Sequence, residues 1–196
     1  MSSINFRTVC FSTNFSNFNS ISIIKQYIMV SNCTDINYLK DYHVQFKHKL
    51  LLENGSQMEY TNSYYEISSF SKINKVCEKA DCFIIFFDLE NNESIIELNK
   101  ILEYINNTCD GEKKIFLINF FTNESNINSN FTEDNLKGYF SKYTLNNFDI
   151  SQVNMDSSDE LTKVIDSITV EILQEKKMSR NKLIDLDNSK SNCLII

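Results

Sequence analysis

Two short runs of the chain are apolar throughout, and they limit the fold more than any other feature. They are Cys82–Phe87 (CFIIFF) and residues 115–118 (IFLI). A strand with one face in water alternates apolar and polar side chains, whereas a strand covered on both faces is continuously apolar. Each run therefore predicts a central strand of a parallel sheet between two layers of helices. A weaker candidate for a third strand surrounds Cys10.

Helical patterns follow these strands. Apolar residues recur at three- and four-residue spacing over 95–105 and over 161–172, which is typical of helices with one buried face. Asn92 is suited to cap the first of these helices. Ser157 and Glu160 have the spacing of a capping box before the second.

A hairpin is predicted between residues 43 and 61, with a turn at Gly55, whose positive φ such turns require. Strands and helices that alternate in this way predict a three-layer α/β domain over residues 1–177. We expect six mostly parallel strands, five helices around them, and an antiparallel edge strand from the hairpin. The pattern stops after about residue 177, so 178–196 is predicted to be a flexible tail.

Composition excludes several classes of protein. The net charge of −7 argues against a nucleic-acid partner, which requires a basic surface. No apolar run approaches the ~18 residues of a membrane span, and the first residues do not resemble a signal peptide. We therefore expect a cytosolic protein with reduced thiols. The six cysteines include no C-x-x-C pair, and Cys10 and Cys82 are expected to be buried.

The order of elements resembles that of the small GTPases of the Ras/Rab superfamily. Residues 80–88 (ADCFIIFFD) and 91–95 (NNESI) resemble the Rab segment GAxGIILVYDxTxxESF, and residues 46–55 resemble the hairpin FKxxxxELDG. Residues 150–172 align with the family's last strand, its SAK loop and its final helix. The resemblance covers residues 5–177 and implies a P-loop-NTPase, Ras-like fold.

The phosphate-binding motif of that family is missing. Small GTPases cradle the phosphates with G-x-x-x-x-G-K-[ST], because glycine lets backbone N–H groups approach closely. The corresponding residues 11–22 contain neither Gly nor Lys, since the first of each in the chain are Gly55 and Lys25. The loop therefore lacks the positive charge that meets the β- and γ-phosphates.

The other four nucleotide motifs are also damaged. The magnesium-binding Thr of switch I corresponds to Asp41, and residues 56–80 contain neither the Asp nor the Gly of D-x-x-G. N-K-x-D becomes NFFT, of which only Asn119 matches, and Thr122 cannot accept the two guanine N–H bonds. The SAK loop becomes residues 154–156 (NMD). We therefore expect no GTP, GDP or magnesium cofactor and no GTP hydrolysis.

Two interpretations of the remaining polar and aromatic residues stay open. Asn119 is either a remnant of the nucleotide-binding set or an ordinary polar residue at a strand end. Phe120 and Phe121 either fill the space of the guanine or belong to the core.

His43 and His48 stand at an odd offset, so on one strand they face opposite sides and cannot share a metal. We expect both to be solvated, and we expect no metal site and no catalytic residues.

The chain ends with Cys193-Leu194-Ile195-Ile196, which matches the C-a-a-X prenylation motif. Ile196 resembles the Leu that directs geranylgeranylation. The single Cys is closer to the Ras and Rho endings than to the two Cys of most Rab proteins. One lipid anchors only marginally, so a second signal is expected from four basic residues, Lys176, Lys177, Arg180 and Lys182.

Together these features predict a Rab-like small-GTPase-family protein, held by a prenyl anchor on the cytosolic face of membranes. Its partners would be proteins of vesicle traffic or signalling. The first alternative is a divergent but functional GTPase that binds GTP or GDP with magnesium. A second alternative is an unrelated α/β enzyme.

Overall fold

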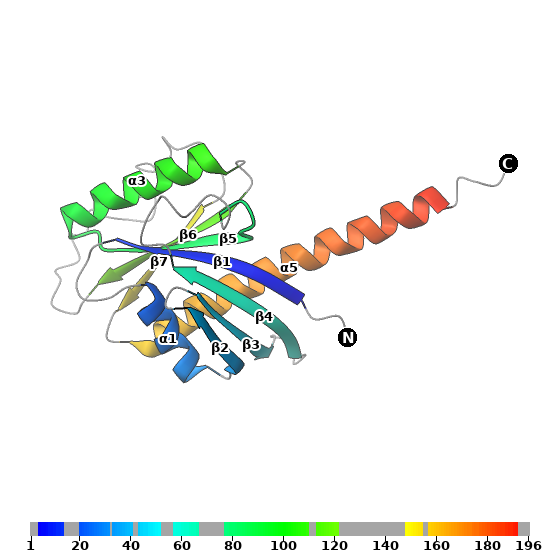
Figure 1. Ribbon diagram of the computed structural model, residues 1–196, viewed down its shortest axis with the longest axis horizontal. Helices are drawn as coiled ribbons and strands as arrows, with labels where there is room; N and C mark the ends of the chain where they lie inside the picture. The colour runs from blue at the N-terminus through cyan, green and yellow to red at the C-terminus, as the bar shows by residue number, and fades with distance from the viewer. Residues whose placement is uncertain are drawn as a thin grey trace.

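The protein is represented by a computed structural model, which describes a mixed sheet with helices on both faces (Figure 1). The described residues are 4–13, 20–31, 33–40, 43–51, 57–66, 77–109, 113–121, 148–154 and 157–191. The elements in chain order are β1 (Ile4–Ser12), α1 (Ser20–Val30), β2 (Cys33–Lys40), β3 (His43–Leu51), β4 (Gln57–Glu66), β5 (Cys82–Phe87), α3 (Asn92–Thr108), β6 (Lys114–Phe121), β7 (Phe148–Asn154) and α5 (Ser158–Ser191).

The seven strands have the order β2-β3-β4-β1-β5-β6-β7. From β4 to β7 all neighbours are parallel, whereas β2, β3 and β4 pair antiparallel. Every residue of β5 is buried, and β5 lies between β1 and β6. The α/β class and the buried central strands predicted from the two apolar runs are confirmed.

Two helical layers account for the apolar runs. Along β5, Cys82, Ile84 and Phe86 belong to the core cluster under α1 and α5. The alternate residues Phe83, Ile85 and Phe87 belong to a second cluster under α3. Because successive side chains of a strand point to opposite faces, a strand between two layers needs an apolar residue at every position.

The predicted strand count was wrong, because β2 adds a seventh strand and occupies the edge. The hairpin strands are present as β3 and β4, but β3 is covered by β2 on one side. β2 was not predicted from the sequence, because its residues 34–39 are exposed and therefore show no alternation of apolar and polar side chains. It is also irregular, with two register shifts against β3 and a positive φ of 50° at Asp35.

The three helices of the described residues are α1, α3 and α5, so the predicted number of five is not tested. The hairpin turn predicted at Gly55 lies outside the described residues. α5 differs from expectation, because its backbone stays helical to Ser191 instead of ending near residue 177. The sequence has no Pro, and no Gly follows residue 138, so no helix-breaking residue stops it.

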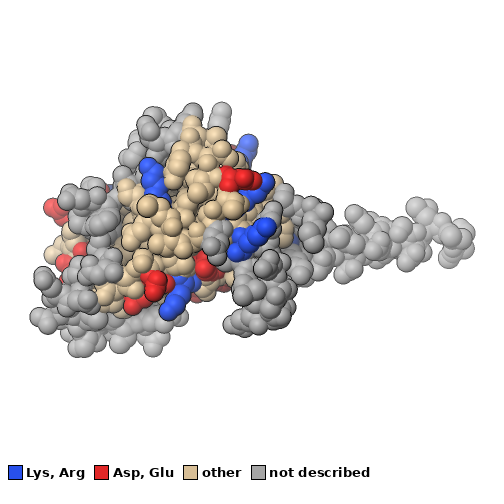
Figure 2. Space-filling model, turned by 90° about the horizontal axis from the view of Figure 1, so that it is seen from below, with Lys and Arg blue, Asp and Glu red and all other residues tan. Residues whose placement is uncertain are grey.

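Polar contacts tie α5 to the far side of the sheet. The Lys114 ammonium on β6 forms ion pairs with Glu171 of α5 and, at 3.5 Å, with Asp149 of β7. The Lys114 side chain is only 11% exposed, so this contact is screened less than a surface pair. Elsewhere, acidic and basic side chains are interspersed across the face seen in Figure 2.

The packing of β5 generates a stability prediction. We expect Ile84→Ala to lower the free energy of unfolding by about 2–5 kcal/mol, because Ile84 is fully buried and its loss leaves a cavity. The matched control is Ile96→Ala on α3, where the side chain is 54% exposed, with an expected change within ~0.5 kcal/mol. Urea unfolding followed by circular dichroism measures both. Equal effects would contradict the central position of β5.

Candidate functional site

The direction of winding changes at the centre of the sheet, between β1 and β5. The chain leaves β1 through α1 toward the β2–β4 side, whereas it leaves β5 through α3 toward β6 on the opposite face (Figure 1). In open α/β sheets, ligands bind outside the carboxyl ends of the strands at such a switch point. The candidate site is therefore the edge formed by the carboxyl ends of β1, β5 and β6.

The end of β1 is bonded directly to the start of α1. The backbone N–H of Ser20, the first residue of α1, donates to the hydroxyl oxygen of Ser12 at 3.3 Å. The first N–H groups of a helix are the groups that bind phosphate in a P-loop. Here a hydroxyl of the chain itself already accepts from one of them. Residues 14–19 lie outside the described part, so the absence of a phosphate-binding loop over 12–20 stays a prediction.

Hydrogen bonds of Thr13 and Ser94 connect β1, β5 and α3. The Thr13 backbone N–H donates to the carbonyl of Phe86 at 3.1 Å, and the Thr13 and Ser94 hydroxyls share a short hydrogen bond. The Ser94 hydroxyl oxygen also accepts from the backbone N–H of Asp88 at 2.8 Å. Thr13 and Ser94 are almost completely buried, so these contacts satisfy polar groups that have lost water.

The start of α3 is also satisfied by the chain itself. The Asn91 side chain accepts from the backbone N–H groups of Glu93 and Ser94 at 2.9 and 3.2 Å. The residue predicted to cap this helix, Asn92, is instead its first residue. The cap is therefore one residue earlier than predicted, a difference that spacing alone does not resolve because both positions are Asn.

Asn119 lies at this edge and contacts the backbone. Its side-chain oxygen accepts from the N–H of Leu89 at 2.9 Å, and Asn119 is 6% exposed. It thus joins the end of β6 to the turn after β5. Phe120 is buried in the α1/α5 core and stacks on Phe86 at 5.6 Å between ring centroids, so it is a core residue. Thr122 lies outside the described residues.

The two histidines face opposite sides of β3, as predicted, but His48 is not solvated. His48 is 4% exposed, and its Nδ1 lies 3.0 Å from the Tyr27 hydroxyl and 2.8 Å from the Tyr60 hydroxyl. The Tyr27 hydroxyl donates to Asp166 at 2.7 Å. The expectation failed because tyrosine hydroxyls from α1 and β4 supply the hydrogen bonds that water would otherwise make. Among the described residues, no group of three or more His, Cys, Asp or Glu is placed to hold a metal.

Burial sets the protonation of this network. It lowers the pKa of His48, an effect that the nearby Asp166 carboxylate partly opposes. Burial also raises the pKa values of Tyr27 and Tyr60 above their ordinary values, and it raises that of Cys33 to about 12. Burial therefore favours the neutral forms of His48, of the two tyrosines and of Cys33.

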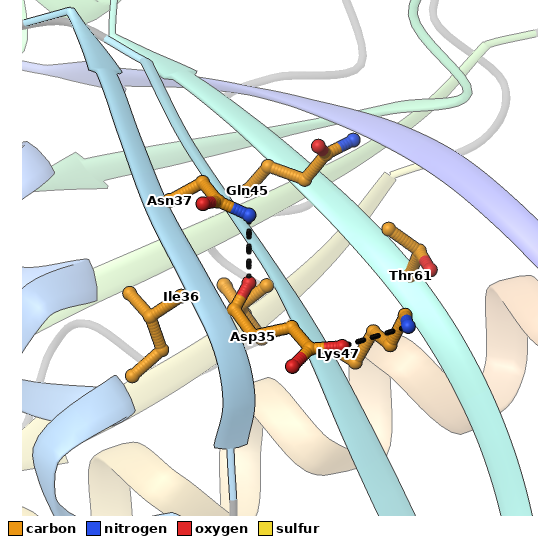
Figure 3. A pocket seen from close by; sticks show the side chains of 7 residues that line it. Asp35, Ile36, Asn37, Gln45, Lys47 and Thr61 are labelled. Atoms are coloured by element: carbon orange, nitrogen blue, oxygen red, sulfur yellow. Dashed lines mark hydrogen bonds and ion pairs between the residues drawn. The ribbon is translucent and has the colours of Figure 1, made fainter.

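Two shallow hollows lie at the other end of β1. One, of about 300 Å³, is lined by residues of β2, β3 and β4, most of them polar, and Lys47 and Asp35 form an ion pair of 2.7 Å there (Figure 3). The second, of about 340 Å³, shares Gln45 with the first and includes Arg7 and Asp81. Neither hollow is at the switch point, because Thr61 in the first pairs with Asn5 at the start of β1.

The structure describes only some of the residues that were predicted to anchor the chain to a membrane. Cys193 lies outside the described residues. Lys176 does not contribute a free charge, because its ammonium contacts the Asp81 carboxylate and the Asn5 carbonyl, each at 2.8 Å. The side chains of Lys177, Arg180 and Lys182 lie outside the described part of the chain. No helix in the described part of the chain is long and apolar enough to cross a membrane.

Comparison with models of known protein families finds no match for this chain. A search of curated proteins also finds no match.

The depressed pKa of His48 predicts a stability that depends on pH. The unfolded chain binds a proton at this histidine near about pH 6.5, whereas the folded protein resists it until lower pH. The unfolded state therefore binds more protons below about pH 6.5, and the folded protein loses stability as the pH falls. We expect His48→Gln to lose less stability than the wild type between about pH 8 and about pH 5.5.

Urea unfolding at the two pH values measures this difference. His43→Gln is the control, because His43 lies on the other face of β3, stacked on Tyr65, and should keep the wild-type difference. If His48→Gln retained the full loss of stability on acidification, other groups would be responsible.

Proposed function

We propose that the chain is a Rab-like member of the small-GTPase superfamily that acts as an interaction module without a nucleotide switch. It is held on the cytosolic face of membranes by a prenyl group on Cys193, and it binds protein partners of vesicle traffic or signalling. It neither binds nor hydrolyses GTP. The family assignment rests on the resemblance over residues 5–177.

The arrangement of the central elements supports the family assignment. A P-loop protein carries its phosphate loop between a strand and the helix that follows it. In this chain β1 is the inner strand at the switch point, and α1 follows it across residues 13–19. This order of elements supports the alignment of residues 11–22 with the P-loop of the family.

The single observation that carries the loss of nucleotide binding is the internal bonding of this edge. Ser12 takes an N–H of α1, Ser94 takes the N–H of Asp88, and Asn119 takes the N–H of Leu89. A nucleotide would have to replace these contacts, and it would meet no Lys before Lys25. One backbone donor at the start of α1, the N–H of Ser20, is therefore already engaged, and the chain supplies no lysine before Lys25 to hold a phosphate.

The long α5 supports the membrane part of the proposal. From residue 177 to Ser191 the helix spans about 22 Å at 1.5 Å per residue, and Figure 1 shows this part running away from the sheet. Cys193 follows two residues later in the sequence. A helix of this length would hold the body away from a lipid surface and leave its faces accessible to partners.

The nucleotide part is tested by calorimetry on the purified full-length chain. We expect no heat of binding for magnesium GTP or magnesium GDP at millimolar concentration, and no nucleotide released when the protein is denatured. A cooperative urea transition in the same sample establishes that the protein is folded. Micromolar binding of either nucleotide would overturn the proposal in favour of a divergent GTP-binding protein.

The anchor is tested in eukaryotic cells by Cys193→Ser. The variant should move from the membrane fraction to the soluble fraction, because a geranylgeranyl chain supplies roughly 0.8 kcal/mol per buried CH₂. Neutralising Lys177, Arg180 and Lys182 should only weaken binding, since each basic residue adds ~1 kcal/mol on an anionic leaflet.

Cys109→Ser is the control, because Cys109 follows α3 within the folded domain and is not in a disulfide, so the change should leave the distribution unchanged. Mass spectrometry of the wild type should find a prenyl thioether at Cys193 and no residues after it. Membrane retention of Cys193→Ser would show that a protein partner, not the lipid, holds the chain there.

A further inference from the structure

Exposed apolar side chains are concentrated at one edge of the sheet. Of the six large apolar residues that are strongly exposed in the described part of the chain, five lie between residues 29 and 39 and one is Ile96 on α3. Single exposed apolar residues are ordinary on any protein surface. A group at the end of α1 and along one strand marks an interaction surface more often than chance exposure does.

The strand that carries most of this surface is β2, which is the edge strand beside β3. An edge strand presents backbone N–H and C=O groups that another strand can bond. Proteins protect such edges with Pro, charged residues or bulges. β2 has bulges on either side of its centre, but residues 36–39 (INYL) carry no charge and no Pro.

Both faces of the β2 edge are bounded by the chain's own side chains. On the helix side, the Lys25 ammonium of α1 lies 5.4 Å from the centroid of the Tyr38 ring, and Met29 follows one turn later on the same face of α1. On the other side, Lys47 neutralises Asp35. Ile36 borders the first hollow, and Figure 3 draws its side chain on the other side of the β2 ribbon from Gln45 and Thr61.

We propose that β2 pairs antiparallel with β2 of a second copy of this chain, about a two-fold axis at Asn37. In this register Asn37 lies opposite itself, and Ile36 of each copy lies opposite the partner's Tyr38. The axis generates two identical pairs of an aromatic and a β-branched residue, which are favourable across antiparallel strands. The two sheets become one, and both open edges are closed by a single isologous contact.

Charge is compatible with this pairing. Asp35 and Lys40 are the only charged residues of β2, and both lie at or beyond the register shifts, outside the regular centre of the strand. No like charges therefore face each other across the axis. At a net charge of −7 each, the two copies repel at long range, so salt should strengthen the dimer by screening.

The bulges of β2 limit the expected affinity of the dimer. The register of β2 shifts between Thr34 and Asn37 and again between Tyr38 and Lys40, and bulges bend and twist a strand. Regular pairing is thus confined to the centre of β2, and the contact is short. We expect a weak, reversible dimer that dissociates on dilution. This inference does not depend on the proposed function, because it uses neither the nucleotide edge nor Cys193.

Sedimentation equilibrium of the unprenylated full-length chain tests the dimer from micromolar to near-millimolar concentration. The wild type should convert from monomer to dimer, and more completely as salt is raised. Tyr38→Lys should weaken the dimer at least about tenfold, because the change enters the interface twice and opposes an apolar partner. Ile96→Lys is the matched control, since Ile96 and Tyr38 are 54% and 55% exposed, and it should dimerise like the wild type.

A second variant covers the case in which Tyr38→Lys does not fold. Asn37→Cys faces its own copy in the proposed register, at a Cβ separation of roughly 4.5–5.5 Å, so oxidised glutathione should convert it rapidly to a disulfide-linked dimer. Two thiols of the copies are oxidised to one disulfide while oxidised glutathione is reduced to two glutathione thiols. Glu90→Cys, on the exposed turn after β5, and the wild type give the background rate.

Three results would overturn the proposal. They are a wild type that stays monomeric throughout the concentration range, equal dimerisation of Tyr38→Lys and Ile96→Lys, and crosslinking of Asn37→Cys no faster than that of Glu90→Cys. If the chain stayed monomeric and instead bound an extended peptide of another protein along β2, the proposal would also be overturned, as in the first of these results.

Discussion

The burial of β5 on both faces is the constraint on which the rest of the structure depends. All six residues of β5 are buried, and they divide between a core under α1 and α5 and a second core under α3. A strand of this kind is stable only inside a sheet with neighbours on both edges and helices on both faces. β1 and β6 supply the neighbours, and the winding of the chain around them creates the switch point.

The switch point is the place where such a fold usually binds a ligand, and this chain uses its own polar groups there. Ser12, Ser94 and Asn119 each accept from a backbone N–H at the edge. These bonds give buried polar groups their partners and link the ends of three strands to the starts of two helices. The bond from Ser20 to Ser12 occupies one of the helix-start N–H groups that could otherwise bind an anion.

At the β2 edge, by contrast, groups that could contact another molecule are exposed. There the backbone groups of a strand and several apolar side chains face outward, with Ile36, Tyr38 and Leu39 all exposed. The centre of the sheet is therefore saturated by internal contacts, and the strand added outside the predicted hairpin is the part with the most capacity for association. A protein without a nucleotide switch would depend on such permanent surfaces, because no bound phosphate rearranges them.

The sequence by itself determined the fold class, the two-sided burial of Cys82–Phe87, the antiparallel hairpin and the helices that follow the apolar runs. Each of these depends on the period of apolar residues along a short segment, which local steric rules translate directly into structure. The tertiary structure alone decided the positions of β2, His48, Lys176 and Ser94. β2 shows no period because its side chains are exposed, and it is held by backbone pairing with β3.

The other three residues are polar, and a polar side chain reveals its role only through its partner. His48 is buried because Tyr27 and Tyr60 approach it from other elements, and Lys176 meets Asp81 from the far end of the sequence. Ser94 meets Thr13, which is 81 positions away. A pattern within one segment cannot encode such pairs, because the pairing energy exists only after the sheet has brought the two segments together.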